Sequence, residues 1–452
     1  MNYDIAIIGG GPAGYTTAIN AARKDLTVIL FEKEDLGGVC LNEGCIPTKA
    51  LLHSAHLYQD ILSASKFGIE SSETPTVNYK KILSRKTKII RKLTAGIKAE
   101  LQSLGVTIHN SAAQLNGERN NLISIQSNGN EFLAKNVLLC PGGYAFVPEL
   151  PGLSNISYLT SREALNLSEL PDSITIIGGG VIGIEFADLY NSLGVSVTVI
   201  EVLPKILGGT DSEISALLQE RLTKKGVSFY LGAKVSAVSS NAVSILTAEG
   251  EELNIPTQNL LISTGRRPNL ENLGLETLQI SHTAKGITVN KHMQTSHPKI
   301  FAAGDITGFS QLAHTAIKEG EVALNNILNL NTEMNYNSIP GIVYTHPEVA
   351  SVGLSEEELI KQGITFKAYK LPLTHSGRFV VENEMETGLL KLLISEDQYI
   401  LGAHMIGNPA SEIILTLGIA IQEKLSITQL SNQIYPHPTV GEILHEAFSR
   451  IQ

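Results

Sequence analysis

The sequence predicts an α/β protein with two similar parallel-sheet units, followed by a C-terminal α+β region. Residues 3–14 and 173–183 each combine a short apolar strand, a glycine-rich turn and the beginning of a helix. Residues 339–452 alternate strands and helices without such a turn. Strand, glycine turn and helix in this order are typical of the Rossmann-like fold. We therefore expect two Rossmann-like dinucleotide-binding domains and a third domain of different architecture.

The first glycine turn fits a dinucleotide-binding fingerprint. Gly9 allows the tight turn, Gly11 lets the backbone approach a pyrophosphate, and Gly14 lets helix and strand pack closely. The pyrophosphate would rest on the N-terminus of the following helix. The next strand ends at Glu32, whose carboxylate can hold a ribose diol. Alone, one such turn is weak evidence.

The second turn repeats the whole fingerprint. Gly178, Gly180 and Gly183 occupy the three glycine positions, and the strand that follows ends at Glu201. The spacing from the first glycine to the acidic residue is the same in both copies. Two complete fingerprints predict that the chain binds two dinucleotides.

The residues after Glu201 bear on the choice of the second cofactor. Residues 202–204 are Val-Leu-Pro, so no arginine follows to receive a 2′-phosphate. This favours NAD over NADP, although the positive charge of Lys205 is a weak argument for NADP.

Two of the three cysteines of the chain lie close together, at Cys40 and Cys45. Gly44 between them allows the chain to turn back and bring the sulfurs to disulfide distance. Pro47 suits the first turn of a helix, so Cys45 would lie at a helix N-terminus, where the pKa of a thiol is lowered. Lys49 would follow one turn later on the same face. The pattern favours a disulfide that cycles between oxidised and reduced forms.

Two other interpretations of the cysteines are weaker. A zinc site needs about four ligands, and Cys140 with scattered histidines does not supply a second pair. A purely structural disulfide is uncommon in a chain without an export signal.

The segment 432–448 contains a candidate proton-transfer pair. His437 lies between two prolines that limit backbone freedom, and Glu442 follows five residues on. A carboxylate that binds one ring nitrogen leaves the other free to accept a proton. Alternatively, Thr439 and Glu442 form only a helix capping box. His445 and Glu446 are rival candidates, less well placed because they would lie within the helix.

Composition excludes several classes of partner. The 452 residues are 43% hydrophobic and 17% charged, with a formal net charge of −10. This charge argues against nucleic acid or an anionic membrane as partner. No apolar run approaches the roughly 20 residues that span a bilayer. Because a strand is expected almost at Met1, we expect no signal peptide and a cytoplasmic location.

A series of motifs extends over nearly the whole chain. In order they are GGGPAG, GGVCLNEGCIPTKALL, GGGVIGIEFA, STGRRPN, FAAGD, LAHTAIKEG, VYTHPEVASVG and YPHPTVGE. In these motifs the chain resembles the pyridine nucleotide–disulfide oxidoreductase family. Within it the chain most closely resembles the dihydrolipoyl dehydrogenase family, which serves 2-oxo acid dehydrogenase and glycine cleavage complexes.

The resemblance implies roles that the residues alone leave open. It implies FAD at the first fingerprint and NAD at the second, with Gly265 and Asp305 among the cofactor contacts and Asp305 facing the ribityl chain. Lys49 and Glu185, locally ordinary helix charges, would form an ion pair near flavin N5, where a cation stabilises negative charge. A buried pair of this kind is costly unless it serves chemistry.

The resemblance also implies a sequence of reactions in a homodimer. His437, oriented by Glu442, would deprotonate a dihydrolipoyl thiol at the disulfide of the other subunit. The thiolate would attack Cys40, and Cys45 would pass electrons to FAD and on to NAD⁺. The lipoyl group would be carried by a separate chain, since no lipoyl domain is fused here.

Domain boundaries follow from the motifs. We expect an FAD-binding domain over 1–143 with a helical insertion near 79–104, whose basic face we interpret as a solvated surface. An NAD-binding domain over 144–265 follows. By resemblance, residues 266–338 complete the FAD domain and 339–452 form a dimerisation domain.

Other functions remain possible at this point. A glutathione reductase-like enzyme would prefer NADPH and carry arginines after the second fingerprint. Mercuric reductases and large thioredoxin reductases carry a terminal redox motif, whereas this chain ends in AFSRIQ. NADH oxidase-like relatives use a single cysteine, whereas this chain has both Cys40 and Cys45. A non-catalytic subunit of a multienzyme complex is an alternative of another class, against which the intact cysteines and the His437–Glu442 pair count.

Two departures from the family pattern stand out. Cys140 and Pro141 replace the usual alanine–threonine–glycine turn and weaken the case for cofactor contacts there. Glu43, between the two cysteines, replaces a commonly apolar residue. A nearby negative charge is expected to raise the pKa of a thiol.

Overall fold

The first sheet has seven strands in the order β3-β2-β1-β6-β5-β4, with β18 beside β6. The computed structural model describes residues 2–70, 73–383 and 386–451. The strands are β1 (Asn2–Ile8), β2 (Val28–Phe31), β3 (Thr107–His109), β4 (Gln114–Arg119), β5 (Leu122–Ser127), β6 (Asn130–Leu139) and β18 (Ile300–Ala302). Only β4 and β5 run antiparallel to their neighbours. Because β18 pairs with β6, the chain returns to this sheet after passing through a second one.

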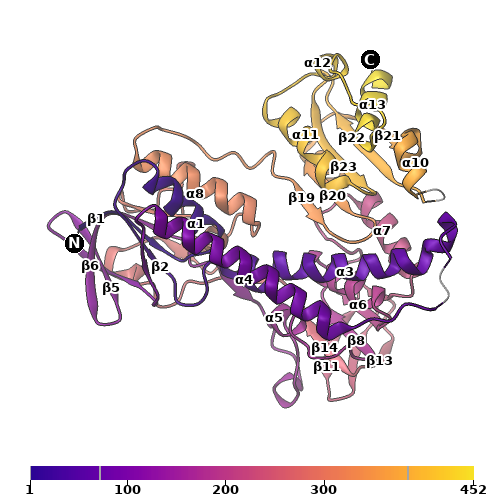
Figure 1. The fold of residues 1–452 in the computed structure, drawn as a ribbon, viewed down its shortest axis with the longest axis horizontal. Helices are drawn as coiled ribbons and strands as arrows, with labels where there is room; N and C mark the ends of the chain where they lie inside the picture. The colour runs from indigo at the N-terminus through magenta and orange to yellow at the C-terminus, as the bar shows by residue number, and fades with distance from the viewer. Residues whose placement is uncertain (1, 71–72, 384–385, 452) are drawn as a thin grey trace.

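Helices α1 (Pro12–Ala22) and α8 (Ala313–Ile327) pack against each other on this sheet (Figure 1). Their close approach requires a glycine, because a Cβ added at Gly320 would lie 2.4 Å from Thr17 Oγ1. Residues buried beneath the pair come from both helices and from β1, β2 and β6. Segments some 300 residues apart in sequence therefore share one core.

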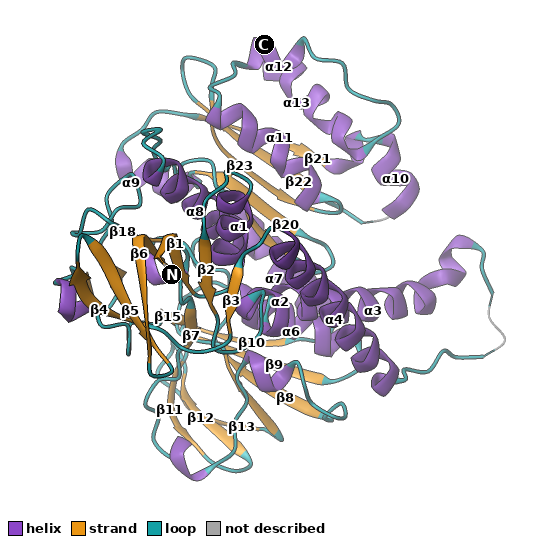
Figure 2. Ribbon diagram, turned by 60° about the vertical axis from the view of Figure 1, so that its left-hand side comes forward, coloured by secondary structure: helices purple, strands orange, loops and turns teal. Residues whose placement is uncertain are grey.

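Between β2 and β3 the chain forms α2 (Gly38–Glu43), α3 (Cys45–Ser63) and α4 (Tyr79–Ser103). Figure 2 shows α3 and α4 lying side by side and extending away from the sheets, and the two helices are in contact. The Asn78 side chain caps α4 by accepting from Lys81 N. The buried Lys86 ammonium donates to Leu165 O at 2.6 Å and so attaches α4 to the second unit.

The second unit contains a four-stranded parallel sheet in the order β10-β9-β8-β14. Its elements are β8 (Ser173–Ile177), α6 (Val181–Ser192), β9 (Ser196–Glu201), α7 (Ser212–Lys224), β10 (Ser228–Leu231) and β14 (Asn259–Ile262). An antiparallel sheet is attached to it, formed by β11 (Lys234–Val238), β12 (Ala242–Leu246) and β13 (Glu252–Pro256). Two short antiparallel strands, β7 (Gly143–Ala145) and β15 (Arg266–Pro268), pair where the chain passes between the two units.

The C-terminal region is a five-stranded antiparallel sheet with helices, in the order β19-β20-β23-β22-β21. Its elements are β19 (Gly341–Val343), β20 (Val349–Gly353), α9 (Glu356–Gln362), β21 (Lys367–Pro372), α10 (Gly377–Asn383), β22 (Leu389–Ile394), β23 (Ile400–Ile406), α11 (Ala410–Gln422), α12 (Ile427–Ser431) and α13 (Ile443–Ile451). The predicted fold class, two parallel-sheet units plus a C-terminal α+β domain, is confirmed. The domain boundaries given above stay predictions.

Short elements complete the fold. They are α5 (Ser161–Ala164), β16 (His282–Thr283), β17 (Gly286–Ile287) and the 3-10 helices η1 (Ala64–Phe67), η2 (Leu153–Asn155), η3 (Leu275–Leu278), η4 (Asp305–Thr307), η5 (Leu373–His375) and η6 (Val440–Glu442). Across the described part of the chain, no helix is both long and apolar enough to traverse a bilayer.

A buried ion pair joins the second unit to the C-terminal sheet. Lys391 on β22 is 2% exposed and lies 2.8 Å from the fully buried Asp211 carboxylate at the start of α7. Glu213 and Glu356 also contact the ammonium, at 3.2 Å and 2.5 Å. Burial lowers the pKa of Lys391, but these carboxylates outweigh that effect and raise it.

Lys391→Met is expected to lower the free energy of unfolding by about 3–5 kcal/mol, because Asp211 would remain buried without its cation. Lys367→Met on the same sheet is the control, since Lys367 is exposed, and should change stability by less than about 0.5 kcal/mol. Denaturant unfolding of the two variants measures the difference. Equal losses would show that the buried pair contributes nothing beyond a surface charge.

Candidate active site

The first glycine turn has the geometry that its fingerprint requires. Gly9 has φ +110°. A Cβ at Gly14 would lie 1.8 Å from Gly9 O, so the third glycine is required for helix and strand to pack. The Glu32 carboxylate, which follows β2, accepts from Gly10 N at 2.7 Å and from Glu34 N at 2.7 Å.

The second turn reproduces this arrangement. Gly178 has φ +112°, and a Cβ at Gly183 would lie 2.0 Å from Gly178 O. The Glu201 carboxylate accepts from Gly179 N at 2.6 Å and from Leu203 N at 2.8 Å. The two copies therefore share their hydrogen bonds as well as their sequence pattern.

The two turns fit dinucleotides. A carboxylate has about four positions at which it can accept a hydrogen bond. Backbone N–H groups occupy two of them in Glu32 and in Glu201, so the others remain for ribose hydroxyls. Gly180 has open space on its Cβ side, and the nearest atom on that side of Gly11 is Gly38 Cα at 3.9 Å. Backbone and phosphate could therefore approach closely at both turns.

Lys205 does not offer a free cation to a 2′-phosphate. Its ammonium donates to Thr210 O at 2.6 Å and to Ser212 Oγ at 2.9 Å. In the structure, Lys205 therefore gives no reason to prefer NADP over NAD as the second cofactor.

Cys40 and Cys45 lie on either side of a helix junction. Cys40 is on α2, and α3 begins at Cys45, with Gly44 between the two helices. Both residues are free thiols and partly buried. Lys49 follows Cys45 by one turn of α3, as the sequence predicted.

The two thiols differ in acidity. The pKa of the Cys45 thiol is lowered to about 7, first by a hydrogen bond from the Cys40 thiol and then by the Lys49 charge, against the effect of burial. The pKa of the Cys40 thiol is raised, first by the same interaction with Cys45 and then by burial. Cys45 is therefore the better thiolate and the better leaving group of the pair.

Alkylation of the reduced protein should report this difference. The rate at Cys45 is expected to be half-maximal near pH 7 and to fall at lower pH, because protonation removes the thiolate. Cys140 should remain unmodified, because it is buried and its thiol pKa is raised. Iodoacetamide labelling at a series of pH values, read by peptide mass spectrometry, measures both rates. A Cys45 midpoint near the ordinary value of about 8.5 would contradict the assignment.

Glu43, whose charge was expected to raise the pKa of a thiol, is paired with a cation in the structure. Its carboxylate lies 2.5 Å from Arg162 Nη2, and Arg162 also contacts Glu34 at 3.0 Å. The pKa of Cys45 is lowered and that of Cys40 is raised, in both cases first by the interaction between the two thiols, so the effect of Glu43 stays a prediction. Arg162 comes from α5 in the second unit, more than 100 residues away in sequence, so this neutralising partner was not predictable from the local pattern.

Lys49 and Glu185 form the ion pair that the family resemblance implied. Lys49 Nζ lies 2.9 Å and 2.8 Å from the two carboxylate oxygens of Glu185, which is on α6. Tyr344 N donates to Glu185 at 3.0 Å, and Lys49 Nζ lies 4.5 Å from the centroid of the Tyr344 ring. No local sequence pattern singles out Tyr344.

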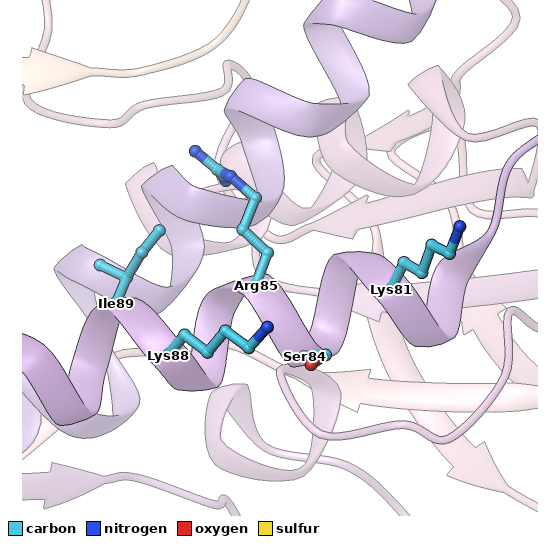
Figure 3. Close-up of a pocket in the computed structure, with 5 residues that line it drawn as sticks. All are labelled: Lys81, Ser84, Arg85, Lys88 and Ile89. Carbon is cyan, nitrogen blue, oxygen red and sulfur yellow. The ribbon is translucent and has the colours of Figure 1, made fainter.

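The basic face of α4 forms a surface hollow of about 620 Å³ (Figure 3). Its lining residues are Lys81, Ser84, Arg85, Lys88 and Ile89. Arg85 Nη1 donates to Ala50 O at 2.8 Å and so connects α4 to α3 at the residue after Lys49. The hollow therefore lies beside the helix that carries Cys45, while the cysteines themselves do not line it.

Asp305 and Arg266 contact each other at 3.4 Å, at the point where the chain crosses between the units. Burial raises the pKa of Asp305, and Arg266 opposes that shift. Glu319 on α8 is fully buried, accepts from Gly304 N at 2.6 Å, and so supports the turn before Asp305. Glu319 lies within the LAHTAIKEG motif, but its charge alone gave no sign of this role. Gly265, next to Arg266, has φ +115°.

Cys140 lies beneath the first turn. Its Sγ lies 3.3 Å from Gly9 O, and a Cβ at Gly9 would lie 2.1 Å from Cys140 O. Ser263 takes the same place beneath the second turn, 2.3 Å from a Cβ at Gly178. Cys140 and Ser263 therefore make equivalent backbone contacts beneath their turns.

His437 and Glu442 are joined directly. His437 Nδ1 lies 2.8 Å from Glu442 Oε2, and the histidine side chain is 79% exposed. Thr439 Oγ1 accepts from Glu442 N, so half of the capping box forms, but the Glu442 carboxylate binds the imidazole instead of completing it. The pair precedes α13, which Figure 2 places well away from α2, the helix that carries Cys40. One chain alone therefore does not bring this pair to the cysteines.

Known proteins share this architecture and its order. Residues 3–320 match the pyridine nucleotide-disulphide oxidoreductase family and residues 339–448 match its dimerisation domain. The chain is 38% identical to a dihydrolipoyl dehydrogenase of Bacillus subtilis and 37% identical to one of Geobacillus stearothermophilus. These alignments cover 98% of this chain in both cases and 97% and 94% of the relatives.

Solved structures agree. LpdA from Mycobacterium tuberculosis has a TM-score of 0.89 at 26% identity, with 99% of both chains covered. The HOCl-induced flavoprotein disulfide reductase RclA from Escherichia coli has a TM-score of 0.85 at 26% identity, with 100% of both chains covered.

Two nucleotide turns, paired cysteines and a C-terminal dimerisation domain define a flavin-dependent disulfide oxidoreductase. The chain belongs to the pyridine nucleotide-disulphide oxidoreductase family. FAD and NAD(H) are its cofactors, which agrees with the two fingerprints.

Proposed function

We propose that this protein is a dihydrolipoyl dehydrogenase that oxidises protein-bound dihydrolipoyl groups with NAD⁺ through a Cys40–Cys45 disulfide. The observation that carries the proposal is Cys45 at the start of α3, with its thiol pKa lowered to about 7 and Lys49 one turn away. The full-length similarity to dihydrolipoyl dehydrogenases supports the choice of substrate.

The chemistry at the cysteines follows from their different acidity. In the oxidised enzyme, a substrate thiolate attacks Cys40; a substrate–Cys40 disulfide forms and Cys45 leaves as a thiolate. The low pKa of Cys45 favours this direction. The second substrate thiol then closes the lipoyl ring, and Cys40 leaves and takes up a proton. Two electrons now reside on the reduced cysteines, and bound FAD supplies the route by which they reach NAD⁺.

His437 moves the protons. Glu442 holds Nδ1, which leaves Nε2 to accept a proton from each substrate thiol and to return one to Cys40. Because His437 is exposed and apart from the cysteines of its own chain, we propose that it serves the cysteines of the partner in a homodimer. The dimerisation domain supports this arrangement.

The remaining cofactor and partner assignments belong to the same proposal. Gly9, Gly11, Gly14, Glu32 and Asp305 would contact FAD, and the second fingerprint with Glu201 and Gly265 would contact NAD. The dihydrolipoyl group would be presented by the lipoyl-bearing protein of a 2-oxo acid dehydrogenase or glycine cleavage complex, in the cytoplasm.

Glu201→Gln is expected to weaken NADH binding about tenfold and to reduce the preference for NADH over NADPH. A charge-assisted hydrogen bond to a ribose hydroxyl contributes about 1.5–3 kcal/mol, and every 1.4 kcal/mol is about tenfold in affinity. KM values for both nucleotides measure the effect. An unchanged ratio of kcat/KM for the two would remove Glu201 from cofactor choice.

Paired assays test the proposed function. The purified protein is assayed with dihydrolipoamide and NAD⁺, and separately with NADPH and glutathione disulfide. Turnover in the first assay alone supports the proposal. Turnover in the second alone would assign a glutathione reductase-like activity, and a colourless, flavin-free protein would favour a non-catalytic subunit.

A further inference from the structure

The ammonium of Lys49 contacts two groups that come from different parts of the chain. One is the Glu185 carboxylate on α6, which is 5% exposed. The other is the ring of Tyr344, which follows β19 of the C-terminal sheet, with its centroid 4.5 Å from Nζ. A cation over an aromatic face is attracted by the ring quadrupole.

Tyr344 is held in place by its own backbone. Its N–H donates to the same Glu185 carboxylate that binds Lys49. Two residues later, His346 N donates to Asp188 at 3.0 Å, one turn further along α6. The segment 344–346 is thus fixed to α6 at two successive carboxylates.

The same two carboxylates fix α3. Lys49 binds Glu185, and two turns later His56 Nε2 lies 2.7 Å from Asp188, which is fully buried. Helices α3 and α6 and the segment 344–346 therefore meet at two levels. Neither the backbone of segment 344–346 nor helix α3 can shift without breaking one of these contacts to α6.

Lys49 needs this confinement. Its side chain is 30% exposed, and lysine has a flexible four-carbon stem. Glu185 alone would hold the ammonium through one group only. The Tyr344 ring supplies a second contact, and burial raises the pKa of its hydroxyl, so the ring is neutral at pH 7.

We propose that Tyr344 is a positioning residue that holds the Lys49 ammonium against Glu185 and beside Cys45. The C-terminal domain of each subunit thereby completes the cysteine site of its own chain, in addition to supplying His437 to its partner. The expected effect of Tyr344 on the flavin potential rests on the proposed function, whereas its expected effect on the Cys45 thiol does not.

The first test measures the Cys45 thiol in the reduced holoenzyme. Tyr344→Leu is expected to slow iodoacetamide labelling of Cys45 at pH 7 by about threefold and to move the rate–pH midpoint upward, because a displaced Lys49 stabilises the thiolate less. Tyr344→Phe keeps the aromatic face and should restore the wild-type profile. If Tyr344→Leu does not fold, Tyr344→Met replaces it.

The matched control is Tyr369→Leu on β21, which removes a half-buried tyrosine from the same domain. It should lower thermal stability without changing the labelling of Cys45. A second readout is redox titration of the bound flavin, whose potential should fall in Tyr344→Leu and remain at the wild-type value in Tyr344→Phe.

Two outcomes would overturn the proposal. In one, Tyr344→Leu loses stability as Tyr369→Leu does but keeps the wild-type labelling profile and flavin potential. In the other, Tyr344→Phe shifts the profile as far as Tyr344→Leu. If wild-type protein does not oxidise dihydrolipoamide, the proposed function fails while the labelling experiment still tests Tyr344.

Discussion

Cys45→Ser is expected to reduce the oxidation of dihydrolipoamide by about 10³-fold or more, because no disulfide can then form with Cys40. A serine hydroxyl cannot accept electrons from a dithiol and is a poor leaving group. Cys45 is also the thiol that Lys49 and the Cys40 thiol stabilise as a thiolate. Loss of Cys45 therefore removes both the disulfide that accepts the electrons and the thiolate charge next to the Lys49–Glu185 pair.

The same variant contains its own control. Under the proposed assignment NADH binds at the second glycine turn and reduces the bound flavin without the cysteines, so this half-reaction should persist. Stopped-flow absorbance separates this half-reaction from steady-state turnover with dihydrolipoamide. Unchanged dihydrolipoamide oxidation in Cys45→Ser would refute the disulfide mechanism, whereas loss of both half-reactions would indicate a folding or flavin-binding defect.

His437→Gln is expected to lower kcat for dihydrolipoamide oxidation by about 10²–10⁴-fold, the range that a positioned general base contributes. Glu442→Gln should have a smaller effect in the same direction, because it weakens the bond that orients Nδ1 without removing the base. Steady-state kinetics with a thermal unfolding control measure both. Gln433→Ala, upstream on the same segment and exposed like His437, serves as the matched variant.

Hybrid dimers test whether His437 acts across the subunit interface. Cys45→Ser and His437→Gln subunits, each inactive alone, are unfolded together and refolded. A hybrid has one site with intact cysteines and an intact partner histidine, so random pairing should restore about one quarter of wild-type activity. No restoration, with dimers confirmed by mass, would place the base and the cysteines in one chain.

The sequence was sufficient for those parts of the site that depend on local geometry. The glycines of both turns were predictable, since a Cβ at Gly14 or Gly183 would collide with the carbonyl of its own turn. The helix start at Cys45 was predictable from Gly44 and Pro47. In each case the physical cause lies within a few residues of its effect.

Contacts between distant segments were not predictable in this way. Arg162 neutralises Glu43 and Tyr344 covers Lys49, although neither pair is close in sequence. Nothing in the local pattern around Glu43 indicates a cation from another unit, so the ion pair with Arg162 was not anticipated. Motif order identified the family but not these partners.

The most direct test is to follow the cysteines through one catalytic cycle. The oxidised holoenzyme is mixed anaerobically with one equivalent of dihydrolipoamide, quenched with an alkylating reagent, and analysed by peptide mass spectrometry before and after NAD⁺ is added. We expect Cys40 and Cys45 to become alkylatable on reduction and to be protected again after NAD⁺, with Cys140 unchanged throughout. If dihydrolipoamide is oxidised while neither Cys40 nor Cys45 changes state, the disulfide mechanism is contradicted.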